Sequence, residues 1–201
     1  MDTLTRRVRC LSMAMVAHAW WPEAEQGLSS ARRRLRQLEG AGLVTLQRVF
    51  ARPLIPLAAP VVRWRPGEPR PDFAPIAHAL QHRFAGAARQ TLIAMATPAA
   101  AQRYGAPVGH PPRAAETTHD LGLASVYLQL LRTAPQRAQT WVFETQLARE
   151  DDAAAQKLPD ALVVEPDGRE TVIEFGGEYG KAKLAAFHRD CAGVDRGYEV
   201  W

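Results

Sequence analysis

Two acidic residues, Asp160 and Glu174, lie beside a pair of short apolar runs. The runs, 161–165 and 171–175, are predicted β-strands, and Pro166-Asp167-Gly168 between them is a turn signal that predicts a hairpin. Such a hairpin brings both carboxylates to one end of a sheet. Carboxylate oxygens are hard ligands that suit a divalent cation such as Mg²⁺. The spacing therefore indicates a candidate metal site built from Asp160 and Glu174.

The elements around the hairpin are predicted in the order helix, three strands, helix, strand. Apolar spacing and β-branched or aromatic content place them at 121–131, 140–144, 161–165, 171–175, 179–191 and 198–201. With the motifs Leu158-Pro159-Asp160-Ala161 and Ile173-Glu174-Phe175, this α-β-β-β-α-β order resembles the PD-(D/E)xK nuclease fold. The resemblance implies a restriction-endonuclease-like core of the α/β class over residues 117–201.

The nuclease pattern also requires a lysine two residues after the second acid, on the same face of the strand as that acid. There it positions the attacking water and stabilises developing charge. This chain has Gly176 at that position. Lys181 or Lys183 on the following helix, or Lys157 before the first acid, would have to supply the cation instead.

Glu144 ends the predicted strand 140–144 and has two interpretations. It is either a third acid of the metal shell or a solvated strand end. An active nuclease would therefore hold Mg²⁺ with Asp160 and Glu174. Its catalytic groups would be those two acids, assisted by Glu144, with Lys181 or Lys183 positioning the water.

The N-terminal third carries a different pattern. Residues 29–42 begin with Ser29 as a predicted cap, place Ala31, Leu35 and Leu38 on one apolar stripe, and end at Gly42. This segment resembles the recognition helix of a winged helix-turn-helix. The resemblance implies a preceding helix over 12–20, a first wing strand over 43–50 and a second wing strand around 61–65.

Positive charge is concentrated in this N-terminal segment. Residues 1–71 hold twelve Lys or Arg against five Asp or Glu, whereas residues 117–201 hold nine against fourteen. The excess favours salt-sensitive binding to duplex DNA. The alternatives are a solvated basic face on a protein-interaction domain, or a homodimer contact. Expected DNA contacts are Ser30, Arg32, Arg33 and Arg36 on the helix, and Arg48, Arg52, Arg63 and Arg65 on the wing.

Length and composition indicate an α+β or α/β protein with three parts: a winged helix at 1–71, a helical connector and linker at 72–116, and the nuclease-like domain at 117–201. A hydrophobic content of 47% excludes a disordered chain. No apolar run is long enough to span a bilayer and no signal peptide is evident, so we expect a cytoplasmic protein without a membrane partner. Two cysteines exclude a disulfide framework or a cysteine-rich zinc site.

This order of domains resembles the replication-relaxation proteins of plasmids and integrative elements. The matching segments are His119-Asp120-Leu121, 141–144, 158–161 and 173–175. The resemblance implies a DNA-binding protein of a mobile genetic element that acts in replication control or DNA mobilisation, with the nuclease-like domain kept as a scaffold. Two alternatives stay open: a Mg²⁺-dependent DNA endonuclease, and a protein-interaction subunit of a nucleoprotein complex.

Overall fold

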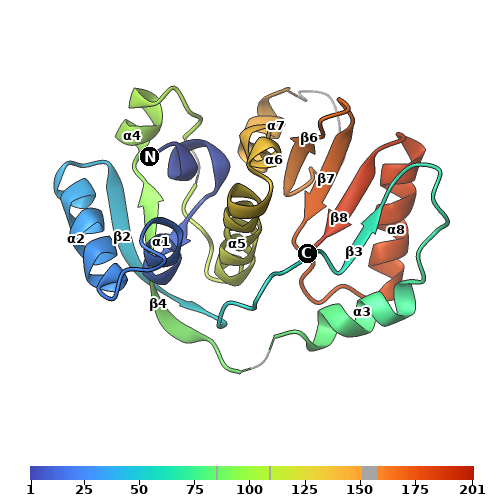
Figure 1. Ribbon diagram of the computed structural model, residues 1–201, viewed down its shortest axis with the longest axis horizontal. Helices are drawn as coiled ribbons and strands as arrows, with labels where there is room; N and C mark the ends of the chain where they lie inside the picture. Colours follow the sequence, from blue (N-terminus) through green and yellow to red (C-terminus); the bar gives the residue numbers. More distant parts are fainter. Residues whose placement is uncertain (85, 109, 151–157) are drawn as a thin grey trace. The chain divides into compact units, whose positions relative to one another are not determined.

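The computed structural model describes residues 1–84, 86–108, 110–150 and 158–201, without the side chains of 148–150. These residues form a mixed α/β structure with two open sheets (Figure 1). They divide into two compact units: Met1–Leu54 with Ala87–Leu128 (unit 1), and Ile55–Gly86 with Gln129–Trp201 (unit 2). The chain therefore crosses between units three times, which differs from the three consecutive parts predicted from the sequence. No helix in the described ranges is long and apolar enough to cross a bilayer.

The sheet of unit 1 contains β1 (Leu11–Ser12), β4 (Arg89–Ala96) and β2 (Val44–Ala51), in that order and all antiparallel. β4 is the middle strand, and its residues Ile93 and Ala94 are fully buried. The prediction that residues 61–65 pair with the first wing strand is therefore wrong. The apolar run of β4 makes an eight-residue ladder with β2 and fills the centre of the sheet, which the short 61–65 segment cannot do.

The helices of unit 1 are η1 (Thr3–Arg7), α1 (Met13–Trp20), α2 (Gly27–Gly40), α4 (Pro98–Arg103) and the first part of α5 (Thr117–Thr133). The predicted serine cap of α2 is wrong, because the helix begins two residues before Ser29, with Gln26 as its N-cap. Its predicted end is confirmed. Gly42 takes a left-handed φ of 69°, and the Leu43 N–H donates to the Leu38 carbonyl at 2.9 Å.

The sheet of unit 2 has the order β3-β8-β7-β6-β5. Its strands are β3 (Val62–Trp64), β5 (Val142–Phe143), β6 (Ala161–Val164), β7 (Glu170–Glu174) and β8 (Gly197–Val200). The predicted hairpin is confirmed, since β6 pairs antiparallel with β7 and Ala161 lies opposite Ile173. β7 and β8 are parallel. The strand predicted at 140–144 is shorter because α7 (Glu144–Glu150) begins at its last residue.

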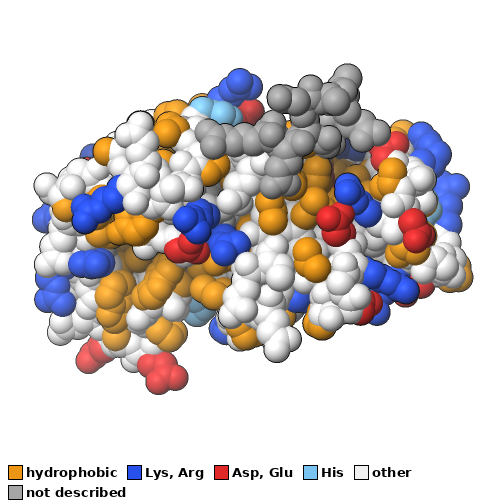
Figure 2. Space-filling model, turned by 90° about the horizontal axis from the view of Figure 1, so that it is seen from above, with side chains coloured by type: hydrophobic (Ala, Val, Ile, Leu, Met, Phe, Trp, Pro, Cys, Tyr) orange, Lys and Arg blue, Asp and Glu red, His pale blue; other side chains and the backbone are white. Residues whose placement is uncertain are grey.

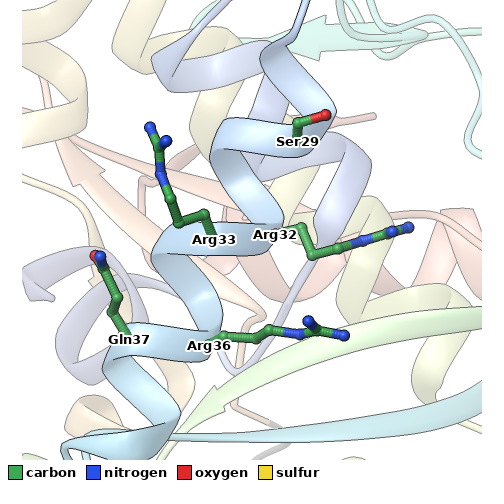
Figure 3. Close-up of a pocket in the computed structure, with 5 residues that line it drawn as sticks. All are labelled: Ser29, Arg32, Arg33, Arg36 and Gln37. Carbon is green, nitrogen blue, oxygen red and sulfur yellow. The ribbon is translucent and has the colours of Figure 1, made fainter.

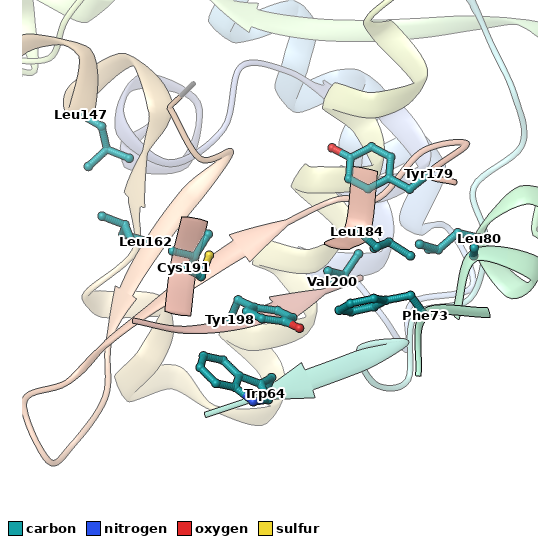
Figure 4. Close-up of a cluster of buried hydrophobic side chains, with 12 residues drawn as sticks. Trp64, Phe73, Leu80, Leu147, Leu162, Tyr179, Leu184, Cys191, Tyr198 and Val200 are labelled. Atoms are coloured by element: carbon teal, nitrogen blue, oxygen red, sulfur yellow. The ribbon is translucent and has the colours of Figure 1, made fainter. Parts of the chain in front are cut away.

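Helices α3 (Phe73–His82), α6 (Pro135–Gln139) and α8 (Lys181–Gly193) also belong to unit 2. α3 packs against α8, so the predicted helical connector at 72–116 is wrong: it splits into α3 in unit 2 and the central strand β4 in unit 1. One face of the sheet buries a cluster of side chains with these two helices (Figure 4). The cluster comprises Trp64, Phe73, Ala77, Leu80, Leu147, Leu162, Val172, Tyr179, Leu184, Cys191, Tyr198 and Val200.

A buried ion-pair network joins the edge strand β3 to its neighbour β8. The Glu199 carboxylate is 1% exposed and its Oε1 lies 2.7 Å from Arg63 Nη2 and 2.9 Å from Arg137 Nη2. Trp201 Nε1 donates to the other oxygen at 2.9 Å. Arg63 therefore pairs with Glu199 on the neighbouring strand of unit 2. The predicted placement of Arg63 and Arg65 on a wing is wrong, because both belong to unit 2.

Replacing Arg137 with alanine should destabilise unit 2 by about 3 kcal/mol, because it removes one partner of a buried carboxylate. The measurement is urea unfolding followed by tryptophan fluorescence. Arg169→Ala is the matched control, since Arg169 forms only an exposed 3.9 Å pair with Asp167 and should cost less than about 1 kcal/mol. Equal losses from the two variants would contradict a stabilising role for the Glu199 network.

Candidate functional site

The exposed face of α2 carries three arginines. Arg32, Arg33 and Arg36 are exposed, while Ala31 and Leu35 on the opposite side are buried in unit 1. Together with Ser29 and Gln37, the arginines line a shallow hollow of about 450 Å³ (Figure 3). Side chains of this type on an outward helix face can reach phosphates or base edges.

Some arginines of unit 1 have acidic partners. Arg9 is buried and its Nη1 lies 2.8 Å from Asp120 Oδ1, and Arg7 lies 3.3 Å from Asp2. Within the part of the chain that the structure describes, no ion pair or side-chain hydrogen bond involves Arg32, Arg33 or Arg36. Their charge is therefore not neutralised by a neighbouring carboxylate.

The antiparallel strands β2 and β4 present further basic residues. Arg48 and Arg89 are exposed on β2 and β4, and Arg52 follows β2, where its backbone N–H donates to Thr118 Oγ1 at 3.1 Å. Phe50, between them, is 66% exposed. On the face drawn in Figure 2, basic side chains (blue) lie at the left edge, the side on which Figure 1 draws α2, and also near the centre and at the right edge. Arg48 and Arg52 were expected on a wing, whereas Arg89 was not among the expected DNA contacts.

The two predicted acids of unit 2 do lie together, as expected. Asp160 is 7% exposed and Glu174 is 1% exposed. The Asp160 N–H lies 3.4 Å from Glu174 Oε2, and the Phe175 N–H donates to Asp160 Oδ2 at 2.8 Å. A backbone donor therefore binds one oxygen of each carboxylate.

Tyr179 adds a third donor to this acid pair. Its hydroxyl donates a hydrogen bond to Glu174 Oε1. Burial first, and then the Glu174 carboxylate, raise the pKa of the Tyr179 phenol far above its usual range, so the proton stays on the tyrosine. The sequence analysis placed Tyr179 at the start of a helix, whereas α8 begins at Lys181 and Tyr179 lies in the preceding turn.

The other predicted catalytic residues lie at different positions relative to this acid pair. Lys183 Nζ is 3.5 Å from the centre of the Tyr179 ring, whereas Lys181 is exposed at the start of α8. The Glu144 N–H donates to the Asp160 carbonyl at 3.2 Å, so its backbone is close to the pair. Lys157 lies outside the described residues. Among those that are described, no three His, Cys, Asp or Glu side chains form a group able to hold a metal ion.

Position 176, where the nuclease pattern has its lysine, has no room for a side chain. A Cβ on Gly176 would lie 2.7 Å from Val200 Cγ1 and 3.1 Å from Leu80 Cδ2. Leu80 is fully buried and comes from α3. The glycine is therefore explained by packing, because α3 fills the space beside the strand end. No local sequence signal could have revealed this, since Leu80 is far from Gly176 along the chain.

Arg83, which the sequence analysis did not select, covers the same strand end. Its Nη2 donates to the Gly176 carbonyl, and its guanidinium lies 4.2 Å from the centre of the Phe175 ring. Burial lowers the pKa of Arg83 to about 10, so it remains a cation near neutral pH. The end of the strand is thus closed by a stacked arginine as well as by Leu80.

Gly176→Ala should destabilise unit 2 by about 1–3 kcal/mol, because the added Cβ overlaps Val200. Gly176→Lys should cost at least as much and should not create nuclease activity. The adjacent Gly177 has open space around it, so Gly177→Ala is the control and should leave the free energy of unfolding nearly unchanged. Chemical denaturation of the three variants measures this, and an unaltered Gly176→Lys protein would refute the packing explanation.

Comparison with known proteins adds no family to this description. No family model, curated protein or solved structure matches the chain.

Proposed function

We propose that the protein binds duplex DNA through the exposed face of α2. The observation that carries this proposal is the set of exposed arginines Arg32, Arg33 and Arg36, which have no acidic partner among the described residues. Arginines without partners on one helix face provide phosphate and base contacts at little cost in broken ion pairs. Unit 1 as a whole holds twelve Arg and no Lys against six Asp or Glu, so its net charge also favours a polyanion.

The topology of unit 1 supports a winged-helix mode of binding. Helices α1 and α2 follow β1 and precede β2 in the chain, and the sheet order is β1-β4-β2. In this proposal α2 is the recognition helix and the antiparallel pair of β2 and β4 is the wing. Arg48 and Arg89 on these strands would contact flanking phosphates, and Arg52 would do so just beyond the end of β2.

We propose that unit 2 is a scaffold related to nucleases that does not cleave DNA. Its acids meet as a nuclease site requires, but backbone N–H groups and the Tyr179 hydroxyl already bind their oxygens. Val200 and Leu80 occupy the space that a side chain at position 176 would need. The resemblance to replication-relaxation proteins extends the proposal to replication control or DNA mobilisation of a mobile element. Fold likeness alone carries no chemistry.

The triple variant Arg32→Ala, Arg33→Ala, Arg36→Ala should lose at least about 100-fold in duplex affinity, because three unpaired cations leave the binding face. Fluorescence anisotropy with labelled duplex in EDTA measures this, and wild-type affinity should fall steeply with salt. A control of equal charge is Arg65→Ala, Arg169→Ala, Arg189→Ala, which removes exposed arginines from unit 2. Equal weakening by both triple variants, or salt-independent binding, would contradict the proposal.

The scaffold proposal and its nuclease rival differ in a simple assay. Supercoiled plasmid incubated with the protein in Mg²⁺ or Mn²⁺ should remain intact, because the acid pair is engaged and position 176 is filled. Nicking that Asp160→Ala abolishes would establish the rival. In that rival Asp160 and Glu174 hold the metal, Glu144 assists, and Lys181 or Lys183 positions the water.

A further inference from the structure

The arginines of α2 point in different directions, and these directions bear on sequence recognition. This inference rests on the proposed function. Figure 3 shows Arg32 and Arg36 extending to one side of the helix and Arg33 and Gln37 to the other, with Ser29 at its N-terminal end. The hollow they line lies over the outward face of the helix.

Helix geometry separates the arginines by direction. Each residue turns the helix by about 100°, so Gly27, Ala31 and Leu35 form one buried stripe centred on Ala31. Arg33 then lies about 20° and Arg36 about 40° from the direction opposite that stripe, whereas Arg32 lies about 80° from it. Arg33 and Arg36 therefore point outward, and Arg32 points sideways.

The one acid of α2 does not neutralise the outward pair. Glu39 Oε1 accepts a hydrogen bond from the Leu46 N–H on β2 at 3.3 Å. Its carboxylate is therefore directed toward β2. Ser29, near the outward direction at the other end of the helix, is small and leaves the face open.

A helix in the major groove directs its outermost side chains to base edges, while side chains on its flanks face the phosphates. An outward arginine matches the O6 and N7 acceptors of guanine with two hydrogen bonds. We propose that Arg33 and Arg36 read guanines in the major groove and that Arg32 holds a backbone phosphate. The protein would therefore prefer duplexes with guanines at two fixed positions.

Lysine substitutions test this assignment, because lysine keeps the charge but lacks the planar fork that contacts guanine twice. A preferred duplex is first selected with the full wild-type chain from a randomised pool. Arg33→Lys and Arg36→Lys should each lower the preference for the selected over a scrambled duplex by roughly 5- to 100-fold, with the salt slope unchanged. Arg32→Lys should keep both properties. Arg32→Ala should weaken both duplexes equally and reduce the salt slope by about 0.9.

Arg34→Ala is the control on the same helix, since Arg34 is exposed beside the buried stripe and points away from the proposed groove. It should change neither affinity nor preference by more than about twofold. If the wild type binds duplex but selects no motif, or if Arg33→Lys behaves as Arg32→Lys does, the guanine assignment is wrong and DNA binding stands. If the wild type binds no duplex, the proposed function itself fails.

Discussion

The excursion of the chain between β2 and β4 is the constraint on which both units depend. After β2 the chain leaves unit 1, adds β3 and α3 to unit 2, and returns to form β4, the middle strand of the first sheet. β3 is held by pairing with β8 and by the buried Glu199 carboxylate. α3 is held by apolar packing against α8. Each sheet is therefore complete only when segments from distant parts of the chain have paired.

The same excursion shapes the surroundings of the acid pair in unit 2. α3 places Leu80 against Gly176 and Arg83 over Phe175, at the end of the strand that carries Glu174. Apolar packing there stabilises the sheet and removes the space in which a catalytic lysine would lie. The acids remain buried and bonded to backbone donors and to Tyr179. The side chains that stabilise the strand end therefore occupy the space that a longer side chain at position 176 would need.

The sequence predicted the elements whose signals are local. The β6–β7 hairpin follows from two apolar runs around Pro166-Asp167-Gly168, and α2 from the apolar stripe that ends at Gly42. Pairing between distant strands carries no local signal, so Val62–Trp64 was matched with β2 although it pairs with β8. For the candidate sites, the proximity of Asp160 and Glu174 followed from the hairpin register. The positions of Tyr179 and Leu80 did not follow from it, because Tyr179 lies in a turn and Leu80 lies on a helix far away in the sequence.

The position of β4 has a practical consequence for work with fragments of this protein. A fragment that stops near residue 71, where composition places a boundary, lacks the middle strand of the first sheet and exposes the edges of β1 and β2. During synthesis on the ribosome, β3 cannot pair until β8 has been made, because Val62 lies opposite Val200. Until then the backbone N–H and C=O groups of β3 have no strand partner.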